Sequence, residues 1–261
     1  MSGDQPPERG HDADFVQSFA RGLAVIKSFG AETPAQSLAD VARATKLSRA
    51  TVRRLLLTLE RLGYATSVDG RFRLTPRLLD LGYAHLSSLD FASIATSYLE
   101  ELRGKLNESS SVSVLDDTDV IYVARVPAKR IMTVSIGLGS RFPAFQTSMG
   151  RVLLAELDDD DIVDRFERSD RSYSTPSTVD SSVELLRRIE EVRAQGWALV
   201  DQELELGVRS VAAPLRDKSG VIAAVNVSTH VSRTEVEELL GRFLPALLEA
   251  AAAINHALEK R

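Results

Sequence analysis

The sequence contains no cysteine, which excludes disulfide bonds, thiolate metal sites and cysteine nucleophiles. It also has no apolar run close to the roughly 20 residues that a membrane-spanning helix needs. Residues 1–13 are polar, lack the apolar core of a signal peptide and are predicted to form a disordered tail. With 44% hydrophobic and 26% charged residues, the composition is that of a globular protein. We therefore expect a cytoplasmic protein that contacts no membrane.

Known catalytic motifs are missing as well. The four histidines are scattered, and no HExxH, GxSxG, Walker or dinucleotide-binding motif occurs. The aspartates of Asp158–Asp161 resemble a metal site, but they are more typical of an acidic helix start, which the helix dipole favours. The sequence therefore predicts no catalytic residue, no metal site and no cofactor.

The charges are divided unevenly along the chain. Residues 14–80 hold 11 Lys and Arg against 6 Asp and Glu, whereas residues 81–261 hold 20 against 28, although the whole chain has a net charge of −5. A small basic module attached to an acidic body suggests a polyanionic partner for the basic part.

The basic part has the pattern of a helix-turn-helix. Apolar residues at three- and four-residue spacing predict a helix over 15–29. Ser37 and Asp40 form a capping box that opens a second helix, Leu38 to Thr45, and Ser48 caps a third that runs to Leu62. Only a tight turn separates the second and third helices, as in a helix-turn-helix.

A hairpin is predicted directly after these helices. Asp69-Gly70 lies between the β-prone runs Tyr64–Val68 and Arg71–Leu74, which is a strong hairpin signal. Thr75 is expected to cap the helix that Pro76 begins. Residues 14–77 are therefore predicted to form a winged helix-turn-helix domain, followed by a helical linker over 78–97.

The polar face of the third helix suggests contact with DNA. A recognition helix presents its N-terminal residues to base edges in the major groove, where Arg can bind guanine. The candidate DNA-binding residues are Ser48, Arg49, Thr51, Arg53, Arg54 and, at the wing, Arg71, with Arg73 beside it. Two alternatives are a solvated basic helix face and a winged helix that binds protein.

The remainder of the chain, residues 98–261, is predicted to be an α+β domain around one antiparallel sheet. The expected strands are 112–115, 120–126, 131–136, 197–202, 210–215 and 221–228. The expected helices are 148–157, 159–166, 183–195 and 234–258.

Taken in order, several blocks of the sequence resemble the IclR family of bacterial regulators. These blocks are Ser18–Ile26, Leu38–Ala42, Leu47–Leu55, Leu62–Tyr64, Thr147–Ala155, Gly196–Glu205, Gly207–Pro214 and Ala224–Ser228. The resemblance implies a GAF-like effector-binding domain and assembly into homodimers or tetramers. Arg130–Val134 and Phe142–Gly150 resemble the branch of the family that controls aromatic-acid catabolism. Relatives in that branch respond to protocatechuate, 4-hydroxybenzoate, muconate or β-ketoadipate.

The same resemblance indicates where a small carboxylate effector binds. It places the pocket at the turn Ser148-Met149-Gly150, at Ser210, and at Asn226 and Ser228, which share one face of a strand. Backbone amides at the start of a helix suit an anion. The family often has cysteine where Ser210 stands, so this chain would use a hydroxyl there.

Four charged residues are weaker candidates for the same site. Asp201 and Glu203 are expected to shape the pocket, and Arg130 and Arg141 to steer a diacid. The competing interpretation for all the polar strand residues is ordinary sheet or surface polarity. The predicted function is a DNA-binding transcriptional regulator modulated by a small organic acid; the alternatives are a sensor without DNA contact and, less favoured, an enzyme.

Overall fold

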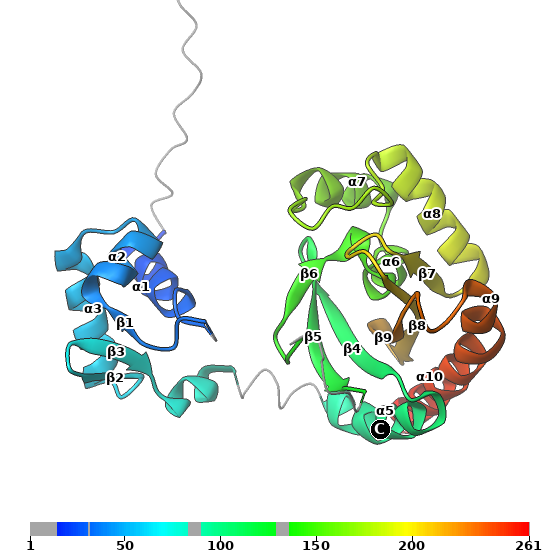
Figure 1. Cartoon of the computed structure of the whole chain (residues 1–261), viewed down its shortest axis with the longest axis horizontal. Coiled ribbons are helices and arrows are strands. Elements are labelled where there is room, and N and C mark those ends of the chain that lie inside the picture. The colour runs from blue at the N-terminus through cyan, green and yellow to red at the C-terminus, as the bar shows by residue number, and fades with distance from the viewer. Residues whose placement is uncertain (1–14, 31, 83–89, 129–135, 261) are drawn as a thin grey trace, which may run out of the picture. The chain divides into compact units, whose positions relative to one another are not determined.

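The computed structural model describes residues 15–30, 32–82, 90–128 and 136–260. The chain divides into two compact units, Met1–Ser87 and Ser88–Arg261, which are described separately (Figure 1). The predicted tail, Arg130 and nearly all of the predicted strand 131–136 lie outside the described residues. No described helix is long and apolar enough to cross a membrane.

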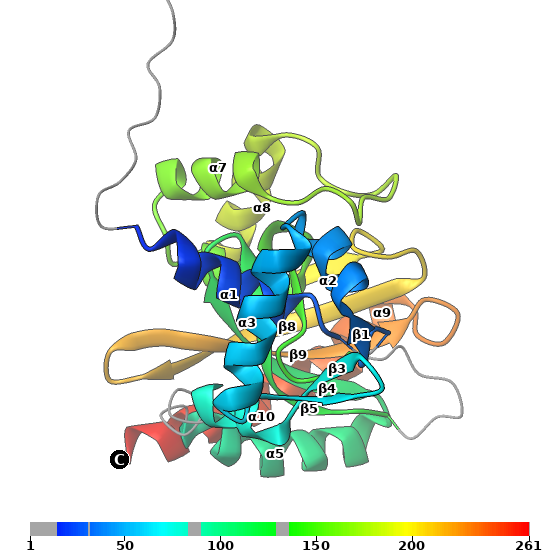
Figure 2. The same ribbon diagram turned by 90° about the vertical axis from the view of Figure 1, so that its left-hand side faces the viewer.

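The N-terminal unit is a winged helix. Its elements are α1 (Gln17–Lys27), β1 (Gln36–Ser37), α2 (Leu38–Thr45), α3 (Arg49–Arg61), β2 (Ala65–Val68) and β3 (Arg71–Leu74). The strands form a small antiparallel sheet in the order β1-β3-β2, and the helices are seen in Figure 2. Five buried side chains form the core, namely Val25, Val41, Val52, Leu56 and Phe72.

Local capping and turn chemistry explain these elements. Both halves of the capping box are present: the Asp40 amide donates to Ser37 Oγ, and the Ser37 amide donates to the Asp40 carboxylate. The hydrogen bond from the Ser37 hydroxyl holds the pKa of Asp40 below its usual value. Asp69 and Gly70 have φ of 52° and 72°, as the tight hairpin turn requires. Thr75 does not act as the expected side-chain cap, because its hydroxyl donates to the Gly63 carbonyl at 2.6 Å; the short 3₁₀ helix η1 (Pro76–Leu78) follows.

The C-terminal unit is built on one six-stranded antiparallel sheet in the order β6-β5-β4-β9-β8-β7. The strands are β4 (Ser109–Asp116), β5 (Asp119–Val126), β6 (Arg141–Pro143), β7 (Ala198–Asp201), β8 (Val208–Asp217) and β9 (Gly220–His230). The helical elements are α5 (Asp90–Leu106), η2 (Ala144–Gln146), α6 (Ser148–Leu154), α7 (Asp159–Arg168), α8 (Ser182–Gln195), α9 (Val236–Glu238), η3 (Leu239–Phe243) and α10 (Leu244–Glu259). The predicted α+β class is confirmed.

Helices cover both faces of this sheet (Figure 1). Helices α5 and α10 pack on one face in a large apolar core, whereas α6, with α7 and α8 beyond it, packs on the other. Asp158 caps α7 by accepting from the Asp161 amide, so the aspartate run is an acidic helix start as expected.

Two expectations about this unit need correction. Residues 90–97, assigned from sequence to the linker, form the first part of α5, where Phe91 and Ala95 are buried in the core. The final helix is not continuous, because the π-helical segment η3 interrupts it before α10. The short strands β1 and β6 were not predicted.

Candidate DNA-binding helix and effector pocket

The outer face of α3 presents three exposed arginines. Val52 and Leu56 point into the core, which leaves Arg49, Arg53 and Arg54 exposed. Among the described residues, none of these guanidinium groups donates a hydrogen bond or joins an ion pair. Unpaired cations on the helix that follows the turn are available for phosphates and base edges.

The two hydroxyl residues at the start of α3 are engaged locally. Ser48 Oγ accepts from the Thr51 amide at 3.2 Å and lies 2.9 Å from Thr51 Oγ1. The Ser48 side chain therefore secures the N-terminal end of the helix that carries the arginines.

The wing arginines differ from each other. Arg71 pairs with β1 in the sheet, and its Nη1 donates to the Ala35 carbonyl at 3.4 Å. Its charge also contributes to lowering the pKa of Asp40. Arg73, two residues along the same strand, is exposed and has no partner among the described residues. Of the two, Arg73 is therefore the more available to contact DNA.

A cavity of about 550 Å³ lies on the α6 side of the large sheet, a size that suits a small organic ligand. Strands β4, β5, β8 and β9 supply its floor, and residues from the loops around β6, η2 and β7 supply its walls. Of the expected pocket residues, Ser210, Asn226 and Ser228 line it. Their side chains share the inner face, while Val225 and Val227 point into the α5–α10 core, which agrees with the alternation expected from the sequence.

A β-bulge brings an arginine and a tyrosine into the cavity together. In the pairing of β4 with β5, Val112 faces Ala124 but Ser113 faces Tyr122, so Val123 is the extra residue. Because of that insertion, Tyr122 and Arg125 lie on the same face of β5, although regular alternation would separate them. Both line the cavity.

Arg125 is the cation of the pocket floor. Its Nη1 donates to Ser111 Oγ at 3.1 Å, and it pairs with no carboxylate among the described residues. Burial lowers the pKa of Arg125, yet an arginine remains charged at neutral pH. A half-buried guanidinium without a counterion can bind the carboxylate of a ligand.

Aromatic side chains form one wall. The ring centroids of Tyr122 and Phe142 are 5.7 Å apart, and those of Phe142 and Tyr173 are 5.9 Å apart, both in edge-to-face geometry. Burial raises the pKa of Tyr122 to about 12, so its phenol is neutral at physiological pH. This wall offers apolar contact to a flat ring.

Two side-chain amides at the cavity carry buried polar atoms that have no partner in the described part of the chain. Both the Nε2 and Oε1 atoms of Gln146, and Oδ1 of Asn226, are buried and form no hydrogen bond among the described residues. Buried polar groups are normally paired, because an unpaired one costs its full desolvation energy. Such atoms in the lining of a cavity are able to form hydrogen bonds with a ligand that enters it.

The turn before α6 adjoins the cavity and is held by its own internal contacts. Thr147 caps this helix by accepting from the Gly150 amide at 2.9 Å, so that amide is already used. A Cβ on Gly150 would lie 2.0 Å from the Ala144 carbonyl oxygen, so only glycine fits. Met149 is buried in the core, and Ser148 Oγ lies 2.8 Å from Ser210 Oγ. Thr147 lines the cavity, whereas Ser148, Met149 and Gly150 are not among its lining residues.

The remaining charged candidates are paired elsewhere. Asp201 binds Arg209 through both carboxylate oxygens, each at 3.0 Å, and is not part of the lining. Arg141 pairs with Asp116 and Asp119 on the surface. Among the described residues, no three His, Asp or Glu side chains come together as a metal ion requires.

A winged helix joined to a unit with a ligand-sized cavity defines a ligand-responsive DNA-binding regulator. Comparison with known families places the chain within this class. Residues 18–69 match the IclR helix-turn-helix domain, and residues 83–256 match the bacterial transcriptional regulator IclR C-terminal domain. The chain therefore belongs to the IclR family of bacterial transcriptional regulators, and it is not an enzyme.

Individual relatives match either nearly the whole chain or its C-terminal part. The Pca regulon regulatory protein of Pseudomonas putida is 46% identical over 250 residues, covering 95% of this chain and 86% of that protein. The crystal structure of a transcriptional regulator from Rhodococcus sp. RHA1 is 51% identical with a TM-score of 0.81, covering 94% of this chain and 98% of that one. A double mutant of the PobR inducer-binding domain from Acinetobacter, solved with 3-hydroxybenzoic acid, is 31% identical with a TM-score of 0.59, covering 63% and 97% respectively.

Proposed function

We propose that this regulator controls the catabolism of aromatic acids and that its DNA binding responds to a hydroxylated benzoate held in the C-terminal cavity. The Gln146 amide and the Asn226 Oδ1 atom, which have no partner among the described residues and lie at that cavity, carry the proposal. The names of the Pca and PobR relatives support it. As a bacterial DNA-binding protein, it acts in the cytoplasm.

The chemistry of the lining selects the ligand class. Arg125 takes the carboxylate, and the Tyr122–Phe142–Tyr173 wall takes the ring. The Gln146 amide carries an unpaired donor and an unpaired acceptor, which a hydroxyl group satisfies at once because it both donates and accepts. An acyclic keto diacid such as β-ketoadipate, or muconate, offers no ring to the aromatic wall.

The DNA-binding part of the proposal rests on α3. Arg49, Arg53 and Arg54 contact bases or phosphates, Ser48 and Thr51 hold the start of the helix, and Arg71 holds the wing against β1. One winged helix makes few contacts, so we propose a homo-oligomer that places two of them on related half-sites of a pseudo-palindromic operator. The exposed Phe15 and Phe19 suit an interface between copies of the chain.

The same domain division implies how the signal is transmitted. A ligand shifts an equilibrium only by its differential affinity for two arrangements, here two spacings of the winged helices. The linker, which was predicted as residues 78–97 but ends at residue 89 because 90–97 belong to α5, joins the unit that binds the effector to the unit that binds DNA.

Thermal-shift measurements with matched ligands test the proposed effector. A ligand that binds only the native state raises the Tm. We expect 4-hydroxybenzoate or protocatechuate to raise it more than benzoate, which lacks the hydroxyl, and more than 4-hydroxybenzyl alcohol, which lacks the carboxylate. A shift with β-ketoadipate or muconate alone would overturn the choice of ligand class. A gel shift with the promoter of the regulated operon, with and without the best ligand, then tests the link to DNA.

A further inference from the structure

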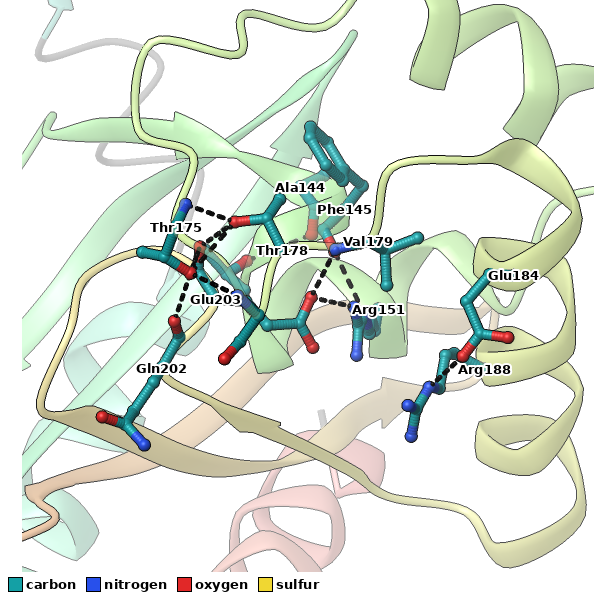
Figure 3. Close-up of polar contacts among 12 residues, drawn as sticks. Ala144, Phe145, Arg151, Thr175, Thr178, Val179, Glu184, Arg188, Gln202 and Glu203 are labelled. Carbon is teal, nitrogen blue, oxygen red and sulfur yellow. Dashed lines mark hydrogen bonds and ion pairs between the residues drawn. The ribbon is translucent and has the colours of Figure 1, made fainter.

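A buried arginine joins three segments that border the effector pocket. Arg151 on α6 is 2% exposed and forms an ion pair with Glu203, which follows β7 and is 9% exposed; Arg151 Nη2 lies 2.5 Å from Glu203 Oε2 (Figure 3). The Nε of Arg151 also donates to the Phe145 carbonyl at 3.1 Å. Neither member of the ion pair is part of the cavity lining.

The loop before α8 is fastened to the same place. The Val179 amide donates to the Glu203 carboxylate at 3.4 Å. The hydroxyl of Thr175 donates to the Gln202 carbonyl, and that of Thr178 donates to the Glu203 carbonyl, each at 2.6 Å (Figure 3). Burial lowers the pKa of Arg151, and the charge of Glu203 opposes that shift.

Each fastened segment carries a lining residue next to its fastening point. Gln146 directly follows Phe145, Leu204 directly follows Glu203, and Tyr173 lies two residues before Thr175. The Arg151–Glu203 pair thus connects three walls of the cavity: Arg151 holds the backbone of Phe145, and Glu203 holds the backbone of Val179 and stands beside Leu204.

We propose that Arg151 and Glu203 are positioning residues of the effector pocket, a role that rests on the proposed function of that pocket. A buried ion pair is a weak source of stability, because desolvation offsets most of the attraction. What the pair supplies here is one fixed arrangement of Gln146, Tyr173 and Leu204. The sequence analysis expected Glu203 to shape the pocket. In the structure Glu203 does not line the cavity, so we infer that it shapes the pocket through its ion pair with Arg151.

The test uses Arg151→Lys, which keeps the charge but cannot donate to two acceptors in the fixed planar geometry of arginine. The matched control is Arg193→Lys. Arg193 on α8 likewise joins a carboxylate, Asp159, and the carbonyls of Ala155 and Leu157, but none of these residues lines the cavity.

Two measurements are made on the full-length protein. Without ligand, we expect Arg151→Lys to speed amide hydrogen exchange in residues 173–179 and 202–205, and Arg193→Lys to leave these segments unchanged. With ligand, we expect Arg151→Lys to weaken the Kd for 4-hydroxybenzoate about tenfold, at the low end of the losses seen when residues supporting a bound metal are mutated. The preference for 4-hydroxybenzoate over benzoate should shrink as well, which a general loss of stability would not cause.

Unchanged exchange and unchanged Kd in Arg151→Lys would overturn the proposal. If that variant does not fold, Arg151→Met combined with Glu203→Leu removes both charges together and so avoids leaving one of them buried and unpaired; the same loss of affinity and selectivity is then expected. A wild-type protein that binds neither probe would refute the proposed effector, while the exchange rates would still decide whether the pair fixes the loops.

Discussion

Replacing Gln146 with methionine should stabilise the protein and weaken effector binding at the same time. Both amide atoms of Gln146 are buried without a partner, and each unsatisfied polar group costs about 1–3 kcal/mol. Methionine is also unbranched and flexible enough to occupy the same space. We expect the free energy of unfolding of the ligand-free protein to rise by about 1–3 kcal/mol. The Kd for 4-hydroxybenzoate should weaken about tenfold, or about 1.4 kcal/mol.

Tryptophan fluorescence reports on the relevant unit alone. The chain has 1 Trp, Trp197, and it lies in the C-terminal unit. For a domain of this size, each kcal/mol shifts the Tm by about 2–4 °C. A ligand at 100 times its Kd stabilises the wild type by about 2.7 kcal/mol, and at the same concentration it should stabilise a variant with a tenfold weaker Kd by only about 1.4 kcal/mol.

The same substitution at Gln36 is a control, because it should lower the free energy of unfolding instead of raising it. Gln36 is buried in the N-terminal unit, but its amide donates to the Ser28 carbonyl at 2.7 Å. Gln36→Met should therefore destabilise its unit by about 1 kcal/mol, measured by circular dichroism. The reasoning about Gln146 is refuted if Gln146→Met lowers the Tm of the ligand-free protein and leaves the Kd for 4-hydroxybenzoate unchanged.

Three other perturbations test other parts of the molecule. Arg49→Ala and Arg53→Ala should each weaken specific operator binding by about 1–3 kcal/mol in a gel shift without changing the melting curve; wild-type affinity would remove α3 from the DNA interface. Asn226→Ala should weaken the effector response by about 1–3 kcal/mol and spare DNA binding without ligand, and an unaltered response would place the effector elsewhere. The pKa of Tyr122 is raised by burial from 10.0 to about 12, so the stability it contributes is complete below pH 10 and is lost as the pH rises through 12. Urea unfolding at pH 9 and pH 11.5 tests this. Between these pH values the free energy of unfolding of the wild type should fall by about 2–3 kcal/mol more than that of Tyr122→Phe. Equal losses in both proteins would contradict the assignment.

The N-terminal unit could be predicted almost residue by residue because its signals are local. The Ser37–Asp40 capping box, the Ser48 cap and the Asp69-Gly70 turn each act over two to four residues. Thr75 and the short strand β1 were the exceptions. The Thr75 hydroxyl donates to the carbonyl of Gly63, 12 residues earlier, and β1 depends on pairing with the distant strand β3.

The pocket was only half predictable for the opposite reason. Alternation along β9 correctly indicated that Asn226 and Ser228 share an inner face. Arg125 was missed because a bulge, which no residue type announces, decides the face on which it lies. The aromatic wall and Gln146 were missed because they depend on contacts between segments that are far apart in the sequence. Periodicity within one segment does not predict such long-range contacts.

The bulge at Val123 determines which residues of β5 face the cavity, because it shifts the alternation of side chains along the strand. Deleting Val123 would remove the bulge and leave Tyr122 and Arg125 two residues apart, so both would still face the cavity. Inserting one more residue between them, with the bulge kept, would exchange the faces on one side of the insertion and separate the two side chains. A single-residue insertion between Tyr122 and Arg125 would therefore alter ligand recognition more than most substitutions would. For anyone reshaping this regulator into a sensor for another acid, the length of β5 is a control as useful as the choice of its side chains.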